Sequence, residues 1–535
     1  MDNNRWWRGA VIYQIYPRSF LDTDGDGVGD LPGILDRLDY VASLGVDAIW
    51  ISPFFKSPMA DFGYDIADYR AVDPLFGTLE DFDRVLAKAH GLGIRVMIDQ
   101  VLSHTSIEHA WFEASRVDRD NDKHDWYVWA DAKPDGTPPN NWLSIFGGVA
   151  WRWEPRRGQY FLHNFLASQP DLNFHNPAVQ QATLDNVKFW LDRGVDGLRL
   201  DAINFCFHDA KLRDNPPKPA ELRVGRGFSP DNPYAFQYHY HNNTQPENLR
   251  FLEQLRALLD QYPGATSLGE ISAEDSLATM AEYVGDSRLH MGYSFELLTD
   301  DKSAAYIRMT VETLEAKMPH GWPCWAISNH DVVRAVSRWG DGTDNAALAK
   351  QLVALVCSLR GSVCLYQGEE LGLTEAEVAF EDLQDPYGIT FWPNFKGRDG
   401  CRTPMPWTAD GGFSDSKSWL PIPAEHGALN VKAQDAAADS PLNTTRHFLR
   451  WRKSHAALVE GDIAFLDAPE PVLAFVRRHA DQAMLVAFNL SGKDVAWQLP
   501  AHQDAKAIGD HGLASGRIAD GTLHLPARGV FFAQL

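Results

Sequence analysis

The sequence predicts an α/β protein built on a (β/α)₈ TIM barrel, with a small domain inserted after the third strand and a C-terminal antiparallel β-sandwich. Helix-type periodicity alternates with short apolar runs between residues 10 and 368. At least seven of these runs are typical of buried strands. This alternation indicates right-handed βαβ units, and the number of strands favours a closed barrel over an open doubly wound sheet.

The predicted elements can be followed along the chain from the first strand, AVIYQIY (10–16). Each later strand of the series follows a segment with helical periodicity. These helix and strand pairs are 34–44 and 46–52, 79–90 and 93–99, 177–193 and 195–201, 247–261 and 265–270, 302–318 and 324–328, and 345–360 and 362–368. Gly45 and Gly194 separate a helix from its strand, as expected of residues that end helices.

Two regions interrupt the alternation of helices and strands. Residues 104–175 are rich in Trp, Asn, Pro and Gly, and they predict an inserted domain B over the barrel mouth. Residues 205–246 predict a loop or a set of short helices beside it. From about residue 456 the pattern changes to short alternating strands separated by turn residues, which indicates a β-sandwich. The predicted domains are therefore the barrel (1–103 and 176–455), domain B (104–175) and the C-terminal domain (456–535).

The composition excludes some classes of partner. The formal net charge of −23 over 535 residues argues against binding to nucleic acid or to anionic membranes. Five cysteines without a CxxC spacing favour a reduced, cytoplasmic protein. We expect no signal peptide and no membrane span, since no stretch approaches roughly 18 apolar residues. The sequence leaves open whether the protein is a monomer or a homodimer.

The segment DTDGDGVGD (22–30) predicts a metal-binding loop. Its carboxylates stand at alternate positions of a glycine-rich turn, as in the first half of a calcium loop. The predicted ligands are Asp22, Asp24, Asp26, Asp30 and the carbonyl of Val28. Gly33 replaces the bidentate Glu expected at the twelfth position, which leaves the choice between Ca²⁺ and Mg²⁺ open. A solvated turn without metal is the alternative, whereas a dinucleotide site is excluded because the aspartates would repel a pyrophosphate.

Three acidic residues, Asp201, Glu270 and Asp331, each end a predicted strand. Because parallel barrel strands point their carboxyl ends to one face, we expect these side chains to meet at one mouth. Charges at the ends of buried strands are costly unless chemistry or pairing requires them. A retaining glycosidase needs a carboxylate and a carboxylic acid about 5–5.5 Å apart, and a third acid helps to raise the pKa of the proton donor. The triad therefore predicts glycoside chemistry.

Three further residues fit the same chemistry. Arg199 lies two positions before Asp201 on the same strand face, so it can orient that carboxylate and keep it ionised. His104 and His330 fit as neutral hydrogen-bond donors to sugar hydroxyls. A structural role is the alternative for any one of them, but together they favour a functional site.

Several motifs, dispersed and in order, carry a resemblance to a known family. They are GVDAIWISP (45–53), DQVLSH (99–104), QPDLN (169–173), GLRLDAIN (197–204), LGEIS (268–272), SNHD (328–331) and GSVCLYQGEELG (361–372). The chain resembles glycoside hydrolase family 13, the α-amylase superfamily, and within it the oligo-1,6-glucosidase/α-glucosidase subgroup.

The resemblance implies roles for particular residues. Asp201 corresponds to the nucleophile, Glu270 to the general acid/base, and Asp331 to the acid that binds ring hydroxyls and stabilises the transition state. It also implies that Tyr64 stacks on the sugar ring. Six substrate-binding residues are implied in all: Asp61, Tyr64, His104, Arg199, His330 and Arg402.

Asp61 and Arg402, the latter in GRDGCRTPMPW (397–407), resemble the family's pair that binds the non-reducing-end glucose and closes the pocket behind it. A structural ion pair is the alternative. The family's structural metal loop matches residues 22–30.

One position bears on the linkage that is cleaved. Members that act on α-1,6 linkages commonly have Val after the nucleophile, whereas this chain has Ala202, as maltase-like members do. The resemblance thus implies an exo-α-glucosidase for α-1,4-linked, maltose-like substrates, with transglucosylation to alcohols. The alternatives are a sucrose-using glucosyltransferase or isomerase, whose Arg-rich loop is not evident here, and a non-catalytic family relative.

Overall fold

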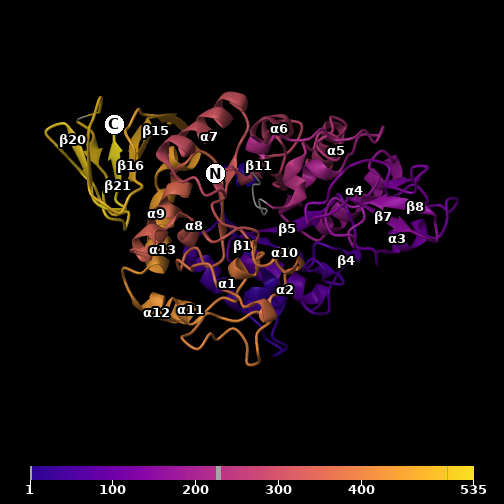
Figure 1. Ribbon diagram of the computed structural model, residues 1–535. Coiled ribbons are helices and arrows are strands. Elements are labelled where there is room, and N and C mark those ends of the chain that lie inside the picture. Colours follow the sequence, from indigo (N-terminus) through magenta and orange to yellow (C-terminus); the bar gives the residue numbers. More distant parts are fainter. Residues whose placement is uncertain (1–2, 224–230, 503) are drawn as a thin grey trace.

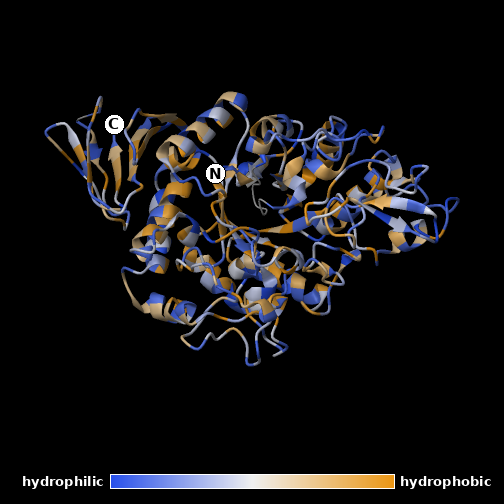
Figure 2. Ribbon diagram, viewed as in Figure 1, coloured by the Kyte–Doolittle hydropathy of each residue, from blue (hydrophilic) through white to orange (hydrophobic). Residues whose placement is uncertain are grey.

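A computed structural model describes residues 3–223, 231–502 and 504–535 of the chain. Its centre is a barrel, with the inserted segment on one side and the C-terminal sheets on the other (Figure 1). The helices carry hydrophobic and hydrophilic stripes, as expected of helices that cover a core on one face and meet solvent on the other (Figure 2).

Eight parallel strands form the barrel, which confirms the predicted fold class. They pair in chain order, and a bridge between Gly292 and Pro323 joins the two ends of the sheet. The barrel strands are β1 (Val11–Ile15), β2 (Ala48–Ile51), β5 (Arg95–Val101), β9 (Gly197–Asp201), β10 (Thr266–Ile271), β11 (Met291–Ser294), β12 (Cys324–Trp325) and β13 (Ser362–Tyr366).

Helices cover the outside of the barrel. Those along the barrel series are α1 (Leu31–Leu44), α2 (Leu79–Gly91), α4 (Pro177–Asp192), α5 (Asn248–Leu259), α6 (Ser276–Tyr283), α7 (Ala304–Lys317), α8 (Ala335–Trp339) and α9 (Asn345–Ser358). Helix α1 begins three residues before its predicted start because Asp30 caps it, its Oδ1 accepting the N–H of Gly33 across 2.6 Å. Gly45 ends it with a φ of 86°, a value that glycine adopts without strain.

Two barrel strands differ from the prediction. β11 was absent from the predicted series because it is only four residues long and its sequence, MGYS, is half small or polar. β12 spans two residues, where the apolar run 324–328 suggested five. Asp331 therefore stands on a loop beyond the strand, not at its end.

Side chains inside the barrel change from apolar to polar along the strands. Ile12, Trp50 and Met97 belong to an apolar cluster that fills the lower part of the barrel. Two residues further on, Gln14 and Asp99 occupy the same faces of β1 and β5, because side chains of a strand alternate between faces. Side chains near the carboxyl ends of the strands thus form a buried polar layer next to this apolar cluster.

The segment between β5 and α4 contains the small sheet β6–β8–β7 and helix α3. Of the predicted excursion 205–246, residues 224–230 lie outside the described part of the chain, and residues 205–223 and 231–246 form turns and short 3₁₀ helices. Elements of these segments are β6 (Trp129–Ala130), β7 (Trp151–Glu154), β8 (Gln159–Leu162), α3 (Ala110–Ser115) and the 3₁₀ turns Ala220–Leu222 and Pro233–Phe236. A short hairpin, β3 (Phe55–Lys56) and β4 (Asp68–Val72), follows β2.

Short helices lead from the barrel to two antiparallel sheets that enclose an apolar cluster, as predicted. The sheets have the orders β14-β15-β16-β21-β18 and β17-β20-β19. The helices are α10 (Pro386–Phe391), α11 (Ala424–Ala428), α12 (Val431–Ala436), α13 (Pro441–Lys453) and α14 (Ala456–Glu460). The strands are β14 (Asp462–Phe465), β15 (Val472–His479), β16 (Gln482–Asn489), β17 (Val495–Gln498), β18 (Lys506–Ala507), β19 (Arg517–Ala519), β20 (Thr522–Leu525) and β21 (Val530–Gln534).

All five cysteines are buried, free thiols. Within the described residues, no helix combines the length and the apolar character that crossing a membrane requires.

Candidate active site

The three predicted acids meet at the carboxyl ends of the barrel strands. Asp201 is the last residue of β9, Glu270 lies one residue before the end of β10, and Asp331 follows β12. All three line one pocket. Of the predicted substrate-binding residues, Asp61, Tyr64, His104 and His330 also line this pocket, whereas Arg199 and Arg402 lie behind its wall and are 0% and 1% exposed.

One guanidinium holds three carboxylates. Arg199 Nη1 lies 2.7 Å from Asp201 Oδ1 and 2.9 Å from Asp99 Oδ1. Arg199 Nη2 lies 2.5 Å from Glu270 Oε1. The other oxygen of Glu270 accepts the backbone N–H of Ala202 across 3.1 Å. These contacts place Arg199 where it can orient both Asp201 and Glu270.

Burial raises the pKa of both central acids. Burial raises the pKa of Glu270 to about 7; the Arg199 charge opposes this shift, and the charges of Asp201 and Asp331 add to it. Burial also raises the pKa of Asp201 to about 7, again opposed by Arg199, so the Arg199 charge does not by itself hold the pKa of Asp201 low, contrary to the expectation from the sequence. Two carboxyl groups that share one guanidinium in a dry site cannot both lose their protons cheaply. The pair therefore suits a reaction that needs one carboxylate and one carboxylic acid near neutral pH.

Asp331 is held ionised. Its Oδ1 lies 3.0 Å from Arg402 Nη2 and 3.3 Å from Arg398 Nη1. Burial acts to raise the pKa of Asp331, but His330 and these two guanidinium groups outweigh it and hold the pKa well below its usual range. A permanent carboxylate at this place can accept hydrogen bonds from sugar hydroxyls and stabilise positive charge on the ring.

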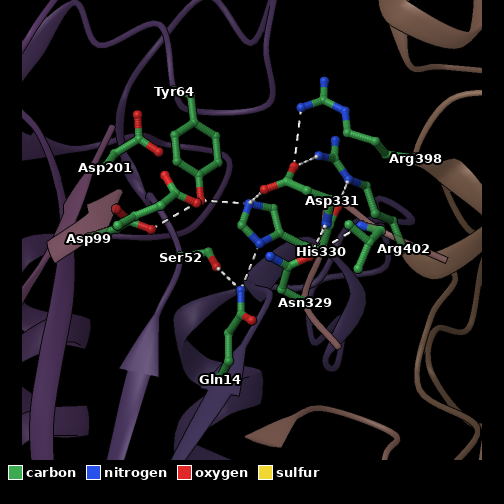
Figure 3. A network of polar contacts seen from close by, with 12 residues as sticks. Gln14, Ser52, Tyr64, Asp99, Asp201, Asn329, His330, Asp331, Arg398 and Arg402 are labelled. Carbon is green, nitrogen blue, oxygen red and sulfur yellow. Dashed lines mark hydrogen bonds and ion pairs between the residues drawn. The ribbon is translucent and has the colours of Figure 1, made fainter. Parts of the chain in front are cut away.

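A chain of hydrogen bonds crosses the polar layer through His330 (Figure 3). Gln14 Nε2 lies 2.8 Å from His330 Nδ1, and His330 Nε2 lies 2.7 Å from the hydroxyl of Tyr64. That hydroxyl donates to Asp99 Oδ2 across 3.0 Å. Burial lowers the pKa of His330 to about 3, so the ring is neutral. Gln14 therefore donates to Nδ1, so the proton of the neutral ring lies on Nε2 and points toward Tyr64 and the pocket.

Tyr64 and His104 occupy the pocket wall. The Tyr64 ring stacks on His330, with centroids 5.4 Å apart and planes at 4°. His104 Nε2 lies 3.0 Å from the carbonyl of Tyr64. Burial lowers the pKa of His104 to about 4, so it is a neutral hydrogen-bonding group, as expected.

Asp61 pairs with a different arginine from the predicted one. Arg398 Nη2 lies 2.9 Å from Asp61 Oδ1, and Gln169 Nε2 donates to Asp61 Oδ2 across 3.1 Å. Arg398 is held in turn by Asp385 Oδ1 at 2.8 Å. The predicted pairing of Asp61 with Arg402 is therefore wrong: Arg402 binds Asp331 and the carbonyl of His330. Both arginines belong to the segment GRDGCR, but only Arg398 lines the pocket.

Comparison with known proteins agrees with this geometry. The alpha-amylase catalytic domain matches residues 14–461. The chain belongs to the alpha-amylase family. It is 55% identical to a probable alpha-glucosidase of Rhizobium meliloti (strain 1021), over 99% of this chain and 97% of that protein. It is 38% identical to the oligo-1,6-glucosidase of Heyndrickxia coagulans, over 92% of this chain and 94% of that protein.

Solved structures extend the comparison. The alpha-glucosyl transfer enzyme XgtA is 72% identical with a TM-score of 0.98, and 99% of each chain is covered. The isomaltulose synthase of Erwinia rhapontici NX5, solved with sucrose, is 32% identical with a TM-score of 0.88, again over 99% of each chain. As a member of this family with alpha-glucosidase relatives, the protein is a glycoside hydrolase that acts on α-glucosides.

Aromatic rings form much of the remaining wall of this family member's pocket. They come from domain B, from the loops after β9 and β11, and from α10. They are Phe146, Phe165, Phe205, Phe295 and Tyr387. An aromatic wall beside the carboxylates can bind the apolar faces of sugars and limit the access of water.

The loop 22–30 brings together three of the predicted metal ligands. Carboxylate oxygens of Asp22, Asp24 and Asp30 lie within 4.8 Å of one another. Asp26 is outside this group, and its Oδ1 accepts the N–H of Val28 across 2.7 Å. Three hard oxygen donors on a tight turn fit Ca²⁺ or Mg²⁺.

Sequence reasoning missed the aromatic wall of the pocket and several polar residues of the site. Asp99, Gln169 and Arg398 stood inside quoted motifs, and a search for every polar residue of those motifs would have found them. Gln14 is the fourth residue of the apolar strand β1 and gave a weak signal. Tyr293, whose hydroxyl donates to Glu270 Oε1 across 2.9 Å, lies on the strand that was not predicted.

Proposed function

We propose that the protein is a retaining, exo-acting α-glucosidase that removes terminal glucose from short substrates, mainly α-1,4-linked ones such as maltose. The observation that carries this proposal is the attachment of Asp201 and Glu270 to one guanidinium, that of Arg199. A retaining enzyme needs its nucleophile and its acid close together. The raised pKa of Glu270, about 7, suits an acid that is still protonated near neutral pH.

The reaction takes two steps. In the first, Asp201 forms a bond to C1 of glucose as the bond from C1 to the glycosidic oxygen breaks, and Glu270 gives its proton to the departing oxygen. In the second, the Glu270 carboxylate takes a proton from water, whose oxygen attacks C1 and releases Asp201. Asp331 and His330 hold ring hydroxyls and stabilise the oxocarbenium-like transition state.

The exo mode of attack is supported by the ion pair of Asp61 and Arg398. This buried pair stands in the pocket wall with Gln169 behind it. A charge-assisted pair of this kind recognises the hydroxyls of a terminal glucose and closes the space where a preceding sugar would lie.

Transglucosylation is the second activity that we propose. An alcohol replaces water in the second step, so the glucosyl group passes from Asp201 to the alcohol oxygen, whose proton goes to Glu270. Support comes from the aromatic wall of the pocket, which favours an acceptor with apolar surface over water, and from the relation to an alpha-glucosyl transfer enzyme at 72% identity.

Sucrose-using isomerisation is the competing function, and the isomaltulose synthase is a structural neighbour that favours it. The absence of an Arg-rich run in residues 397–407 disfavours it. A non-catalytic relative is disfavoured because all three acids are present and meet in one pocket.

Product analysis tests the proposal. The protein is incubated with maltose, isomaltose and sucrose to compare rates and products. The anomer of the glucose first released is followed by proton NMR with 4-nitrophenyl α-glucoside, whose only glucose is the one that is cleaved. Fastest hydrolysis of maltose, and release of α-glucose from the aryl glucoside, are expected. First release of β-glucose contradicts the retaining mechanism, whereas an isomer of sucrose as the main product supports the competing function.

We also propose that the loop 22–30 binds a structural Ca²⁺ or Mg²⁺ through Asp22, Asp24 and Asp30, with Asp26 and the Val28 carbonyl as the remaining predicted ligands. The cation would neutralise repulsion among these carboxylates and fix the turn before α1.

We propose a cytoplasmic location for the protein, since its five buried thiols are free. A sedimentation experiment measures whether the protein is a monomer or a homodimer.

A further inference from the structure

Tyr293 touches the general acid from behind. It lies on β11, is 1% exposed and is not part of the pocket lining. Its hydroxyl donates to Glu270 Oε1 across 2.9 Å and accepts a hydrogen bond from Arg199 Nη2 across 3.0 Å. Burial raises the pKa of Tyr293 well above its usual value, so the phenol keeps its proton and remains a donor.

The two oxygens of Glu270 have different surroundings. Each carboxyl oxygen has two lone-pair positions in its plane. Oε1 accepts the hydroxyl of Tyr293 across 2.9 Å and lies 2.5 Å from the cationic Arg199 Nη2. Among the described residues, Oε2 accepts the backbone N–H of Ala202 across 3.1 Å and has no cation beside it. The hydrogen bond and the adjacent positive charge both disfavour a proton on Oε1, so Oε2 is the better place for the acid proton.

We propose that Tyr293 is a positioning residue that confines the transferred proton to Glu270 Oε2. This inference rests on the proposed glucosidase function. In the first step the proton moves from Oε2 to the glycosidic oxygen as the C1–O bond breaks and the bond from Asp201 to C1 forms. In the second step Oε2 takes the proton of water or of an alcohol. Tyr293 keeps its own proton throughout.

Several charged or titratable groups face this pair from the surrounding strands and loops. They are Arg199 and Asp201 on β9, Asp99 on β5, Asp331 after β12 and Cys364 on β13. A change of Tyr293 to Phe removes one oxygen atom. Of these groups only Arg199 loses a hydrogen bond, and its ion pairs with Asp99, Asp201 and Glu270 do not involve the hydroxyl.

The test compares two substrates over a range of pH. In Tyr293→Phe the Glu270 carboxylate loses a donor, so the alkaline limb of kcat/KM is expected to move up by about one pH unit. Because the proton can then sit on either oxygen, turnover of maltose is expected to fall about tenfold. Turnover of 4-nitrophenyl α-glucoside, whose leaving group needs little protonation, is expected to change less than about twofold. An unmoved limb with equal losses on both substrates overturns the proposal.

Tyr13→Phe is the matched control. The Tyr13 hydroxyl donates to Glu370 Oε1 across 2.7 Å, in an equally buried site away from the pocket. This variant is expected to lose comparable thermal stability without moving the limb, and a limb moved equally by both changes overturns the proposal.

A second variant tests the proposal even if Tyr293→Phe does not fold. Site-specific 3-fluorotyrosine at position 293 keeps the hydroxyl and makes it a stronger donor, so the limb is expected to move to lower pH. No movement, or movement upward, contradicts the role of Tyr293. A wild-type protein without α-glucosidase activity refutes the proposed function instead, whereas an active wild type with an unmoved limb in both variants refutes only this inference.

Discussion

The backbone N–H of Ala202 binds Glu270 Oε2 across 3.1 Å, and Ala202 has a φ of 39°. The residue after the proposed nucleophile thus helps to hold the proposed general acid, from a left-handed conformation that non-glycine residues rarely adopt. Its side chain also lines the pocket. The proposed determinants of linkage preference and of proton transfer therefore meet at Ala202.

Ala202→Val is expected to raise activity on isomaltose relative to maltose, because it adds bulk where the aglycone leaves. It is also expected to lower the turnover of both substrates severalfold, since a β-branched residue is strained at positive φ. Steady-state kinetics on the two disaccharides measures both effects. Ala202→Gly, which removes the methyl group and tolerates this φ, is the control. An unchanged ratio in Ala202→Val places linkage choice elsewhere, for instance in residues 205–246.

Asp201→Asn is expected to lower turnover of an aryl α-glucoside by more than about a thousandfold, because the covalent step loses its nucleophile. Binding of substrate, measured by calorimetry, is expected to survive. More than about one hundredth of the wild-type rate remaining in this variant contradicts the assignment.

Activity is expected to fall as the pH rises through about 7, the pKa to which burial and neighbouring carboxylates raise Glu270. The sign follows from its role: the first step needs the protonated acid, so kcat/KM decreases about tenfold per pH unit above the pKa. A pH profile with maltose measures this limb. In Glu270→Gln most maltose turnover is expected to be lost, and the remaining activity is expected not to fall with rising pH. A fall of activity near pH 7 that persists in this variant belongs to another group.

Asp61→Asn is expected to raise the KM for maltose about tenfold or more, because the neutral amide weakens the pair with Arg398 and loses an acceptor for sugar hydroxyls. Competitive inhibition by glucose is expected to weaken in parallel. Asp385→Asn, which alters the same arginine from outside the pocket, is the matched control. Equal effects of the two changes indicate that Asp61 acts only by holding Arg398.

Removal of divalent cations with a chelator is expected to lower the melting temperature by several degrees, and Ca²⁺ or Mg²⁺ is expected to restore it. Calorimetric melting of Asp24→Ala is expected to show no response to the cation. Asp26→Ala provides the comparison: a full response assigns the site to the three carboxylates that lie together, whereas a lost response adds Asp26 to the ligands. A wild-type melting temperature that the chelator leaves unchanged rules out a structural metal.

Much of the barrel could be predicted because its strands carry a strong pattern. Long helices such as α4 and strands such as β5 combine clear periodicity with end signals, and both were found close to their observed bounds. β11 has four residues without a periodic pattern, and the ring of parallel strands, which supplies its hydrogen-bond partners, is what makes it a strand. Tyr293 was missed for the same reason.

The pairing of charged side chains shows the other limit. Arg398 and Arg402 stand four residues apart in one motif, and each pairs with a buried aspartate. Which arginine faces Asp61 depends on the path of residues 397–402 past the barrel mouth, and local sequence does not encode that path.

The sequence by itself determined the barrel, the triad of Asp201, Glu270 and Asp331, and the family, because these depend on local periodicity and on residue types in order. Only the tertiary structure decided that Arg199 binds both Asp201 and Glu270, that Arg398 rather than Arg402 meets Asp61, and that Tyr293 supports the acid. These contacts join residues far apart in the chain, and burial sets their strength by removing water. Neither these contacts nor the burial of the residues that make them can be inferred before the strands close into a barrel.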